Sequence, residues 1–260
     1  MRNIVFYKKL QELYDEIPTA VMSNFSNIEF PTHNWHMINS VPHYYKKTDD
    51  RQLINELLGS YITKCFGLKS VDYQIVTKDD KQGIASPIFF NPENFYFYAS
   101  DFYFSPNNHH SLLKLKNMCS NDRNFKQLVD EIISLSISDF YRDENDRHAC
   151  NICFEKDLDI TLAPIFDFGN SYRNNVGIEN PIFNIDFYSK KIKLESAFKD
   201  FIDFPLFKEK LLLILSLDME EMLKNIESIY QIKISEKLKR AYLNTDKKKK
   251  TLVKELGTYF

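Results

Sequence analysis

Two short polar stretches in the middle of the chain contain the residue types that phosphoryl transfer requires. The first, "NDRHACN", places Asp146 five residues before Asn151, and the second, "APIFDFGN", contains Asp167. Phosphoryl transfer uses one carboxylate to position the attacking hydroxyl, while a second carboxylate and an amide oxygen hold Mg²⁺ against the phosphates. Each of these residues alone is most often an ordinary turn or cap residue, so their arrangement has to carry the prediction.

The elements around these stretches predict that the three side chains converge. The pieces "ICFE", "KDLD" and "ITLAPIF" indicate a strand, a turn and a returning strand, with "DFGN" at the end of the second strand. Because a hairpin returns its end to its beginning, Asp167 is expected beside Asn151. We therefore expect Asn151 and Asp167 to bind the metal and Asp146 to orient the acceptor.

A long amphipathic helix is predicted just before the first stretch. Asn121 precedes apolar residues spaced by three and four, which is typical of a helix buried along one face. These residues are Phe125, Leu128, Val129, Ile132, Ile133, Ile137 and Phe140. The helix is expected to end just before "DENDRHACN", so that this polar loop starts from a buried support.

The two stretches together resemble a known family. "NDRHACN…DFGNS" is similar to the pattern Asp-x-His-x-x-Asn and a downstream metal-binding Asp in HipA-like kinases, and "DRH…N…DFG" also occurs in phosphoinositide kinases. The histidine follows the aspartate here, so the HRD order of eukaryotic protein kinases is absent. The resemblance, sharp over about 121–171, implies that Asp146 is catalytic and that Asn151 and Asp167 are metal ligands. It implies ATP and Mg²⁺ as cofactors and a loop-stabilising role for His148.

The resemblance also implies a fold. We expect an α+β, two-lobed protein-kinase-like fold in one domain over 1–260, with a strand-bearing N-lobe over about 1–100 and a mainly helical C-lobe over about 101–260. The N-lobe strands are expected in "WHMIN", "HYYKK", "DYQIVT" and "GIASPIFF". C-lobe helices are expected near 193–201, 206–230 and 233–255.

Such a fold needs a lysine for the nucleotide phosphates and a glutamate that holds it. Lys46 and Lys47 point to opposite faces of one predicted strand, and Lys46 is preferred because Lys47 borders a polar turn. Glu56 is the acidic residue inside the following predicted helix, "RQLINELLGSYITKCF", which Asp49 or Asp50 can cap. Lys46 and Glu56 are therefore predicted to bind the cofactor as an ion pair.

The N-terminal part departs from the usual kinase pattern. No G-x-G-x-x-G motif precedes the lysine. The segment 20–34, with Ser23 and Ser26, is the candidate to cover the phosphates instead. We also see no room for the additional N-terminal domain of full-length HipA proteins, so a short member with a single kinase domain is expected.

Composition restricts the remaining classes. The 260 residues carry 34 basic and 36 acidic side chains, for a net charge of −2, so no nucleic-acid binding is expected. The run "DKKKK" at 246–250 is interpreted as a solvated helix face. No apolar run approaches the length of a membrane span, and a cytoplasmic protein is expected, with secretion as an effector left open.

Four cysteines raise the question of a zinc site. Cys150 and Cys153 form C-x-x-C next to His148, but Cys65 and Cys119 are isolated in the sequence. A structural zinc site needs four ligands, so reduced, packed thiols are predicted.

Three functions remain open from the sequence. The leading one is a HipA-like Ser/Thr protein kinase with a protein substrate, acting as a toxin with an antitoxin partner or as an effector. The second is a small-molecule or phosphoinositide kinase, which the mostly acidic "DENDRH" disfavours because lipid phosphates favour basic surroundings. The third is a pseudokinase-like binding module, against which the presence of Asp146, Asn151 and Asp167 argues.

Overall fold

The structure is a computed structural model in which a defined part of the chain can be described. This part comprises residues 34–38, 41–78, 81–87, 89, 94–99, 109–144, 146–147, 151–172, 183–186, 191–194 and 204–257. Predictions for Ser23, Ser26, His148 and Cys150, and for the segment 20–33, lie outside the described residues.

An antiparallel sheet of four strands forms the N-terminal part. Its strands, in spatial order, are β1 (Asn34–Ile38), β2 (Val41–Lys47), β4 (Lys81–Pro87) and β3 (Gln74–Lys78). The structure confirms a strand in each of "WHMIN", "HYYKK", "DYQIVT" and "GIASPIFF", but β3 starts two residues later than predicted and β4 ends at Pro87. Residues 39, 88 and 90 of these predictions lie outside the described part. The register places Lys46 opposite Ile84 on β4, and Ile84 is buried. The β2 strand ends at Lys47, just before the cap of the following helix.

Helix α2 (Asp50–Cys65) follows β2 directly and has defined ends. Asp49 is its N-cap, and its side chain accepts a hydrogen bond from the Gln52 main-chain N–H at 2.7 Å. In return, the Gln52 side chain accepts a hydrogen bond from the Asp49 main-chain N–H. This capping box satisfies donors that a helix start leaves unpaired. The helix ends at Phe66, and Gly67 has a φ of 78°, which glycine adopts without steric cost. The predicted helix is confirmed, with Asp49 as its cap.

Helix α2 is buried far more completely than its apolar stripe predicts. The sequence predicts one apolar stripe, made of Leu53, Leu57, Tyr61, Ile62 and Cys65. The buried residues also include the polar side chains of Asn55, Glu56, Ser60 and Thr63, whereas Cys65 is exposed. The prediction of one buried face was therefore too narrow. At Gly59 a Cβ atom would lie 2.4 Å from the Cβ of Phe168, so this glycine lets α2 approach the segment after β7.

A second sheet carries the predicted hairpin. It contains β5 (Phe95–Tyr98), β6 (Cys153–Lys156) and β7 (Ile160–Leu162), in that order. The sequence prediction extended the second strand to residue 166, which is wrong. Pro164 has no N–H to donate to a ladder, and Ile165 pairs instead with the segment at Ser70 in an isolated parallel bridge. Asp167 thus follows an irregular segment that contacts the N-terminal half.

Helix α4 (Asp122–Arg142) confirms the predicted amphipathic helix, and α3 (His109–Met118) precedes it. Asn121 caps α4 by accepting a hydrogen bond from the Asn124 main-chain N–H at 2.9 Å. Its C-cap, Asp143, has a left-handed φ of 51°. The polar loop therefore starts from the end of a well-anchored helix.

The C-terminal part differs from prediction at two places. The predicted helix at 193–201 is wrong at its start, where β9 (Lys191–Leu194) pairs with β8 (Phe183–Asp186), and residues 195–201 lie outside the described part. The alternation in "KIKL" suits a strand. The predicted helix at 206–230 is divided into α5 (Phe204–Ser216) and α6 (Met219–Tyr230), since Asp218 caps the second. Helix α7 (Glu236–Gly257) confirms the last predicted helix.

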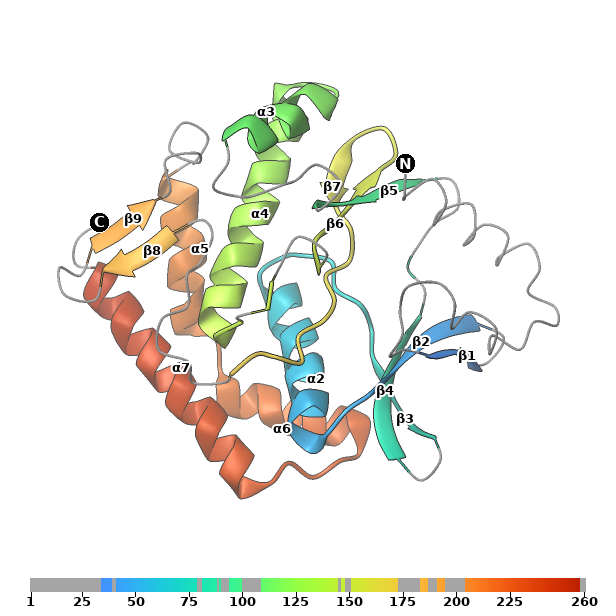
Figure 1. Cartoon of the computed structure of the whole chain (residues 1–260). Coiled ribbons are helices and arrows are strands. Elements are labelled where there is room, and N and C mark those ends of the chain that lie inside the picture. The colour runs from blue at the N-terminus through green and yellow to red at the C-terminus, as the bar shows by residue number, and fades with distance from the viewer. Residues whose placement is uncertain are drawn as a thin grey trace.

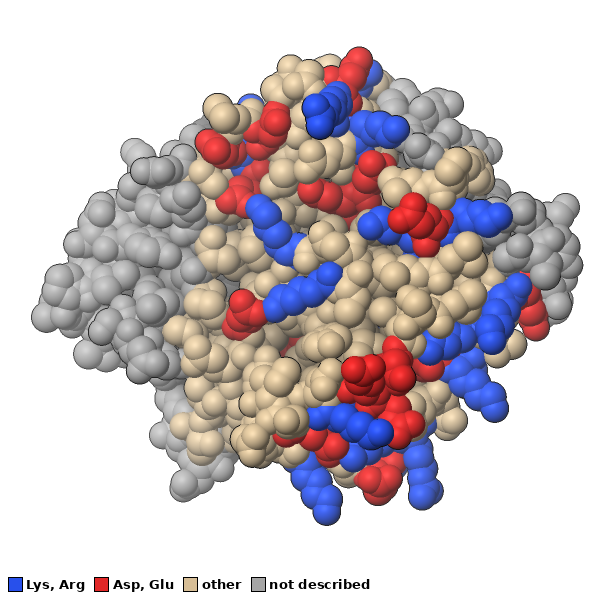
Figure 2. All heavy atoms as spheres, turned by 180° about the vertical axis from the view of Figure 1, so that it is seen from behind, with Lys and Arg blue, Asp and Glu red and all other residues tan. Residues whose placement is uncertain are grey.

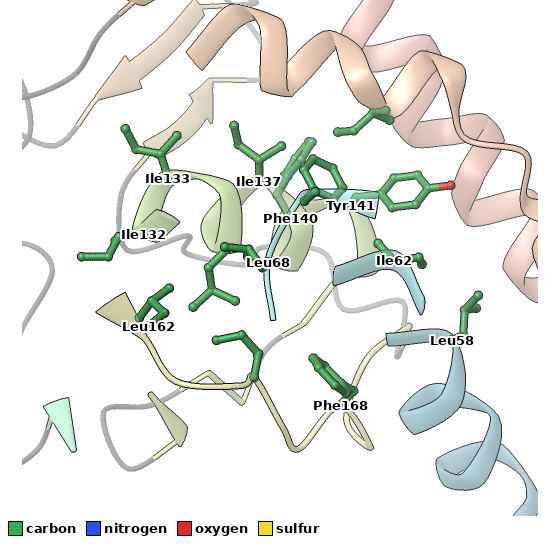
Figure 3. Close-up of a cluster of buried hydrophobic side chains, with 14 of the residues drawn as sticks. Leu58, Ile62, Leu68, Ile132, Ile133, Ile137, Phe140, Tyr141, Leu162 and Phe168 are labelled. Carbon is green, nitrogen blue, oxygen red and sulfur yellow. The ribbon is translucent and has the colours of Figure 1, made fainter. Parts of the chain in front are cut away.

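One continuous core joins these elements. Figure 1 shows α2 between the four-stranded sheet and the helices of the C-terminal part, and α2 contacts both α4 and α6. In Figure 3, Ile62 of α2 lies near Tyr141 of α4, and Leu58, Phe140 and Phe168 belong to the same buried cluster. Since α2 and α4 share this core, the two groups of elements cannot shift relative to one another without disturbing it.

The charged groups are mixed on the surface. On the face in Figure 2, basic and acidic side chains are interspersed. The prediction of a solvated helix face at 246–250 holds for Lys247 and Lys248, which are exposed, but is wrong for Lys249. Lys249 is largely buried, pairs with Asp143 at 2.5 Å and lies 4.0 Å from the centre of the Phe140 ring. Among the helices of the described part, none is both long and apolar enough to cross a bilayer.

Candidate active site

Lys46 is the cationic centre of a cluster that joins three distant segments. Its Nζ lies 2.7 Å from Glu56 Oε1 and 2.5 Å from Asp167 Oδ1. Lys47, the next residue on β2, is exposed. Strand alternation sends the two lysines to opposite faces, and the structure places Lys46 on the face toward α2. Burial lowers the pKa of Lys46, but the charges of Glu56 and Asp167 outweigh it and raise the pKa above its usual value.

Glu56 is completely buried and has donors on both carboxylate oxygens. Its Oε1 accepts from Lys46, and its Oε2 accepts from the Tyr73 hydroxyl at 2.8 Å and from the Phe168 main-chain N–H at 2.7 Å. A buried carboxylate is costly unless it is paired and hydrogen-bonded. Burial and the adjacent Glu56 charge raise the pKa of Tyr73, so its hydroxyl stays protonated and donates. Glu56 thus connects α2, the chain before β3 and the segment of Asp167.

Asp167 lies at the meeting point of these segments in an unusual backbone conformation. Its φ is 60°, which is rare for a residue with a Cβ and marks local strain. Its main-chain N–H donates to the Tyr73 hydroxyl at 3.3 Å, and its Oδ2 accepts from Asn151 Nδ2 at 3.2 Å. The surrounding hydrogen bonds hold this conformation and present the carboxylate toward Lys46 and Asn151.

Asn151 connects Asp167 to Asp146. Its Nδ2 also donates to the main-chain oxygen of Asp146 at 3.0 Å. Because both of these bonds use the amide nitrogen, the amide oxygen is the atom suited to a cation. The Asp146 carboxylate accepts from Asn170 Nδ2 at 2.5 Å. The structure therefore brings together Lys46, Glu56, Asn151 and Asp167, and attaches the loop of Asp146 to them.

Two buried arginines, Arg147 and Arg142, support the loop that contains Asp146. Arg147 donates to Asp139 Oδ2 at 3.1 Å, to the Phe166 carbonyl at 2.8 Å and to the Asn151 carbonyl at 3.3 Å. Arg142 also binds Asp139, and its guanidinium lies 4.5 Å from the centre of the Phe168 ring. Arg147 thus fixes the main chain at Asn151 and immediately before Asp167.

Sequence reasoning assigned no site role to Tyr73, Asp139, Arg147 or Asn170. Asp139 carried a usable signal, because it is an acidic residue on the apolar face of a predicted buried helix and such a residue needs a partner. Tyr73 carried none, since a tyrosine before a strand is ordinary.

The donor set suits a hard divalent cation. Asp167 and Asn151 offer carboxylate and amide oxygens, and each oxygen has more than one lone pair. Within the described residues no group of three or more His, Cys, Asp or Glu side chains is placed to hold a metal. With Asp167 and Asn151 as its protein ligands, a Mg²⁺ ion here would complete its coordination with phosphate oxygens and water, which is usual for this ion.

Comparisons with known proteins establish the fold. No protein-family model matches the chain, and no curated protein sequence matches it significantly. Among solved structures, the proinflammatory kinase CtkA of Helicobacter pylori is similar with a TM-score of 0.62 and 16% identity, over 88% of this chain and 94% of CtkA. HipA, from a Shewanella oneidensis MR-1 toxin–antitoxin complex with HipB and operator DNA, gives 0.61 and 12%, over 94% of this chain and 70% of that one. The chain has a kinase-like fold, as the sequence predicted.

We predict that Glu56→Gln destabilises the protein. The Gln side chain would place an N–H group where the Glu56 carboxylate only accepts hydrogen bonds, and it would remove the buried negative charge that pairs with the Lys46 ammonium. We expect the free energy of unfolding to fall by about 3 kcal/mol. Urea unfolding measures this loss. Glu209→Gln on the exposed side of α5 is the matched control and should change the free energy of unfolding by less than about 0.5 kcal/mol. Equal effects of both substitutions would contradict the described role of Glu56.

Proposed function

We propose that this protein is an ATP- and Mg²⁺-dependent kinase of the HipA-like type that phosphorylates Ser or Thr hydroxyls of a protein. The observation that carries the proposal is the convergence of Lys46, Glu56, Asn151 and Asp167 beside Asp146, in a chain with the fold of CtkA and HipA. One ammonium, two metal-ligand types and one separate carboxylate form the set that phosphoryl transfer needs.

Each side chain has a role in this proposal. Lys46, held by Glu56, binds the nucleotide phosphates. Asn151 and Asp167 hold Mg²⁺, which neutralises charge on the phosphates. Asp146 orients the acceptor hydroxyl and takes its proton, while the acceptor oxygen forms a bond to the γ-phosphorus and the bond from that phosphorus to ADP breaks.

A protein acceptor and a protein regulator are the finer parts of the proposal. HipA was solved together with HipB in a toxin–antitoxin complex, and an antitoxin-type partner for this chain is proposed by analogy with it. The acceptor can be identified by mass spectrometry of cell lysate proteins after incubation with this protein and labelled ATP. Label on Ser or Thr of a protein supports the proposal, whereas label only on lipid or small molecules would replace it with the second function.

The adjacent lysines offer a matched test of nucleotide binding. We expect Lys46→Ala to weaken Mg-ATP binding at least about tenfold. The reason is that an ion pair between an ammonium group and a phosphate contributes on the order of 1.4 kcal/mol or more. Lys47→Ala, one residue away and exposed, should leave the affinity within about twofold. Isothermal calorimetry measures both. The reverse order of effects would move the phosphate contact to Lys47.

The metal role of Asp167 predicts a specific loss. Asp167→Asn keeps the shape of the side chain but removes its charge, so we expect Mg-ATP affinity to fall at least about tenfold. ATP binding without Mg²⁺ should change much less, and calorimetry with and without Mg²⁺ separates the two. A variant that binds Mg-ATP like the parent protein would show that Asp167 is not a metal ligand.

Asp146 should be needed for chemistry but not for nucleotide binding. Asp146→Ala should keep the affinity for ATP within a few-fold, while phosphotransfer falls by about a hundredfold to ten-thousandfold. Asp143→Ala and Glu144→Ala are the comparison variants, because these carboxylates flank the same loop. Asp143 pairs with Lys249, and Glu144 binds Ser171, so neither is directed at an acceptor. If Asp146→Ala kept phosphotransfer while Asp143→Ala or Glu144→Ala lost it, the role of orienting the acceptor would belong to that neighbouring residue.

A further inference from the structure

The carboxylate of Asp146 is contacted by a residue that lies beyond Asp167. Asn170 Nδ2 donates to Asp146 Oδ2 at 2.5 Å across 24 residues of sequence. Among the described residues, the Asn170 side chain has no hydrogen bond to Asn151 or Asp167. The Asn170 side chain therefore contacts the carboxylate that is proposed to orient the acceptor and does not contact the proposed metal ligands.

The segment that carries Asn170 is fixed on both sides. Asn55 Nδ2 donates to the Gly169 carbonyl at 2.9 Å and to the Ser171 carbonyl at 2.8 Å. Asn55 is completely buried, and its Oδ1 accepts from the Tyr242 hydroxyl at 2.9 Å. Helices α2 and α7 thus determine where the Asn170 main chain lies.

The same segment also fixes the main chain of Asp146. Glu144 Oε1 accepts from the Asp146 N–H at 2.9 Å, and Glu144 Oε2 accepts from the Ser171 hydroxyl at 2.6 Å. Burial raises the pKa of Glu144, and the charges of Arg147 and Arg142 oppose this shift. Asn170 therefore holds the side chain of Asp146, and Ser171 holds the main chain of Asp146 through Glu144.

We propose that Asn170 is a positioning residue that sets the rotation of the Asp146 carboxylate for phosphoryl transfer. The inference rests on the kinase function proposed above. An amide N–H can only donate, so it selects Oδ2 of the two carboxylate oxygens and aligns the carboxylate plane. Catalytic groups lose efficiency when they depart from productive geometry by fractions of an ångström. The Asn170 side chain thereby aligns the acceptor-orienting carboxylate without touching the proposed metal ligands.

The test compares Asn170→Ala and Asn170→Asp with the parent protein, each in the Asp146 and the Asp146→Ala background. Asn117→Ala, on the exposed side of α3, is the matched control. The readouts are Mg-ATP affinity by calorimetry, thermal unfolding, and the initial rate of labelled-phosphate transfer from Mg-ATP to lysate proteins. The rate is measured at saturating ATP and as a function of ATP concentration.

With Asp146 present, we expect Asn170→Ala to lower the saturating rate about tenfold to a hundredfold, while the ATP concentration for half-maximal rate and the Mg-ATP affinity stay within about threefold. Asn170→Asp has the same shape and should lower the rate further, because it places a like charge against Asp146. In the Asp146→Ala background neither change should lower the residual rate further, since residues that act through one another are not additive.

Three results would overturn the inference. An Asn170→Ala rate equal to that of the parent, with Asp146→Ala inactive, removes the positioning role and leaves the kinase function intact. Equal losses in both backgrounds, or a loss of Mg-ATP affinity, assign Asn170 a general structural role. The third result is a parent protein without Mg-ATP binding or phosphotransfer, which refutes the kinase function itself. If Asn170→Ala unfolds, the isosteric Asn170→Asp variant decides between these outcomes.

Discussion

The arrangement of the site depends on one buried carboxylate. Glu56 has no exposed surface, and the three groups that donate to it come from β2, from the chain before β3 and from the segment after β7. A carboxylate in such a place is stable only while its donors remain. Each donor therefore fixes its own segment relative to α2, and the position of Asp167 follows from where Phe168 must donate.

The packing around α2 makes this constraint effective. Helix α2 packs against α4 and α6, its Glu56 pairs with Lys46 of β2, and Gly59 allows Phe168 to lie directly on it. The buried Arg142 guanidinium also lies close to Gly59 and is 4.5 Å from the centre of the Phe168 ring. Because protein interiors are close-packed, a shift of α2 would displace Phe168 and, with it, the strained backbone of Asp167.

The functional groups themselves lie on irregular segments that polar side chains hold in place. Arg147 binds two main-chain carbonyls, Asn55 binds two others, and Glu144 binds a main-chain N–H and a hydroxyl. Helix α7 contributes through Tyr242 and through Lys249, which is buried beside Asp143 at the end of α4. Loops supported in this manner can present side chains that a regular strand or helix would direct elsewhere.

The sequence by itself determined the local elements and the order of the polar residues. The apolar spacing predicted α4, and Asp49 or Asp50 predicted the start of α2, because these signals depend on neighbours within a few residues. The resemblance carried by the stretch from Asp146 to Asp167 implied a kinase-like fold. Local signals for the end of β7, at Pro164, and for the division between α5 and α6, at Asp218, were present in the sequence but were not used. The partners of Lys249 could not be read locally. The sequence predicted the pair of Lys46 and Glu56, but only the tertiary structure decided that Lys46 also pairs with Asp167, that Asn170 reaches Asp146 and that Tyr73 joins the cluster. These last three contacts join residues that are 121, 24 and 17 positions apart in the sequence, so they depend on how distant segments pack together, which no local pattern records.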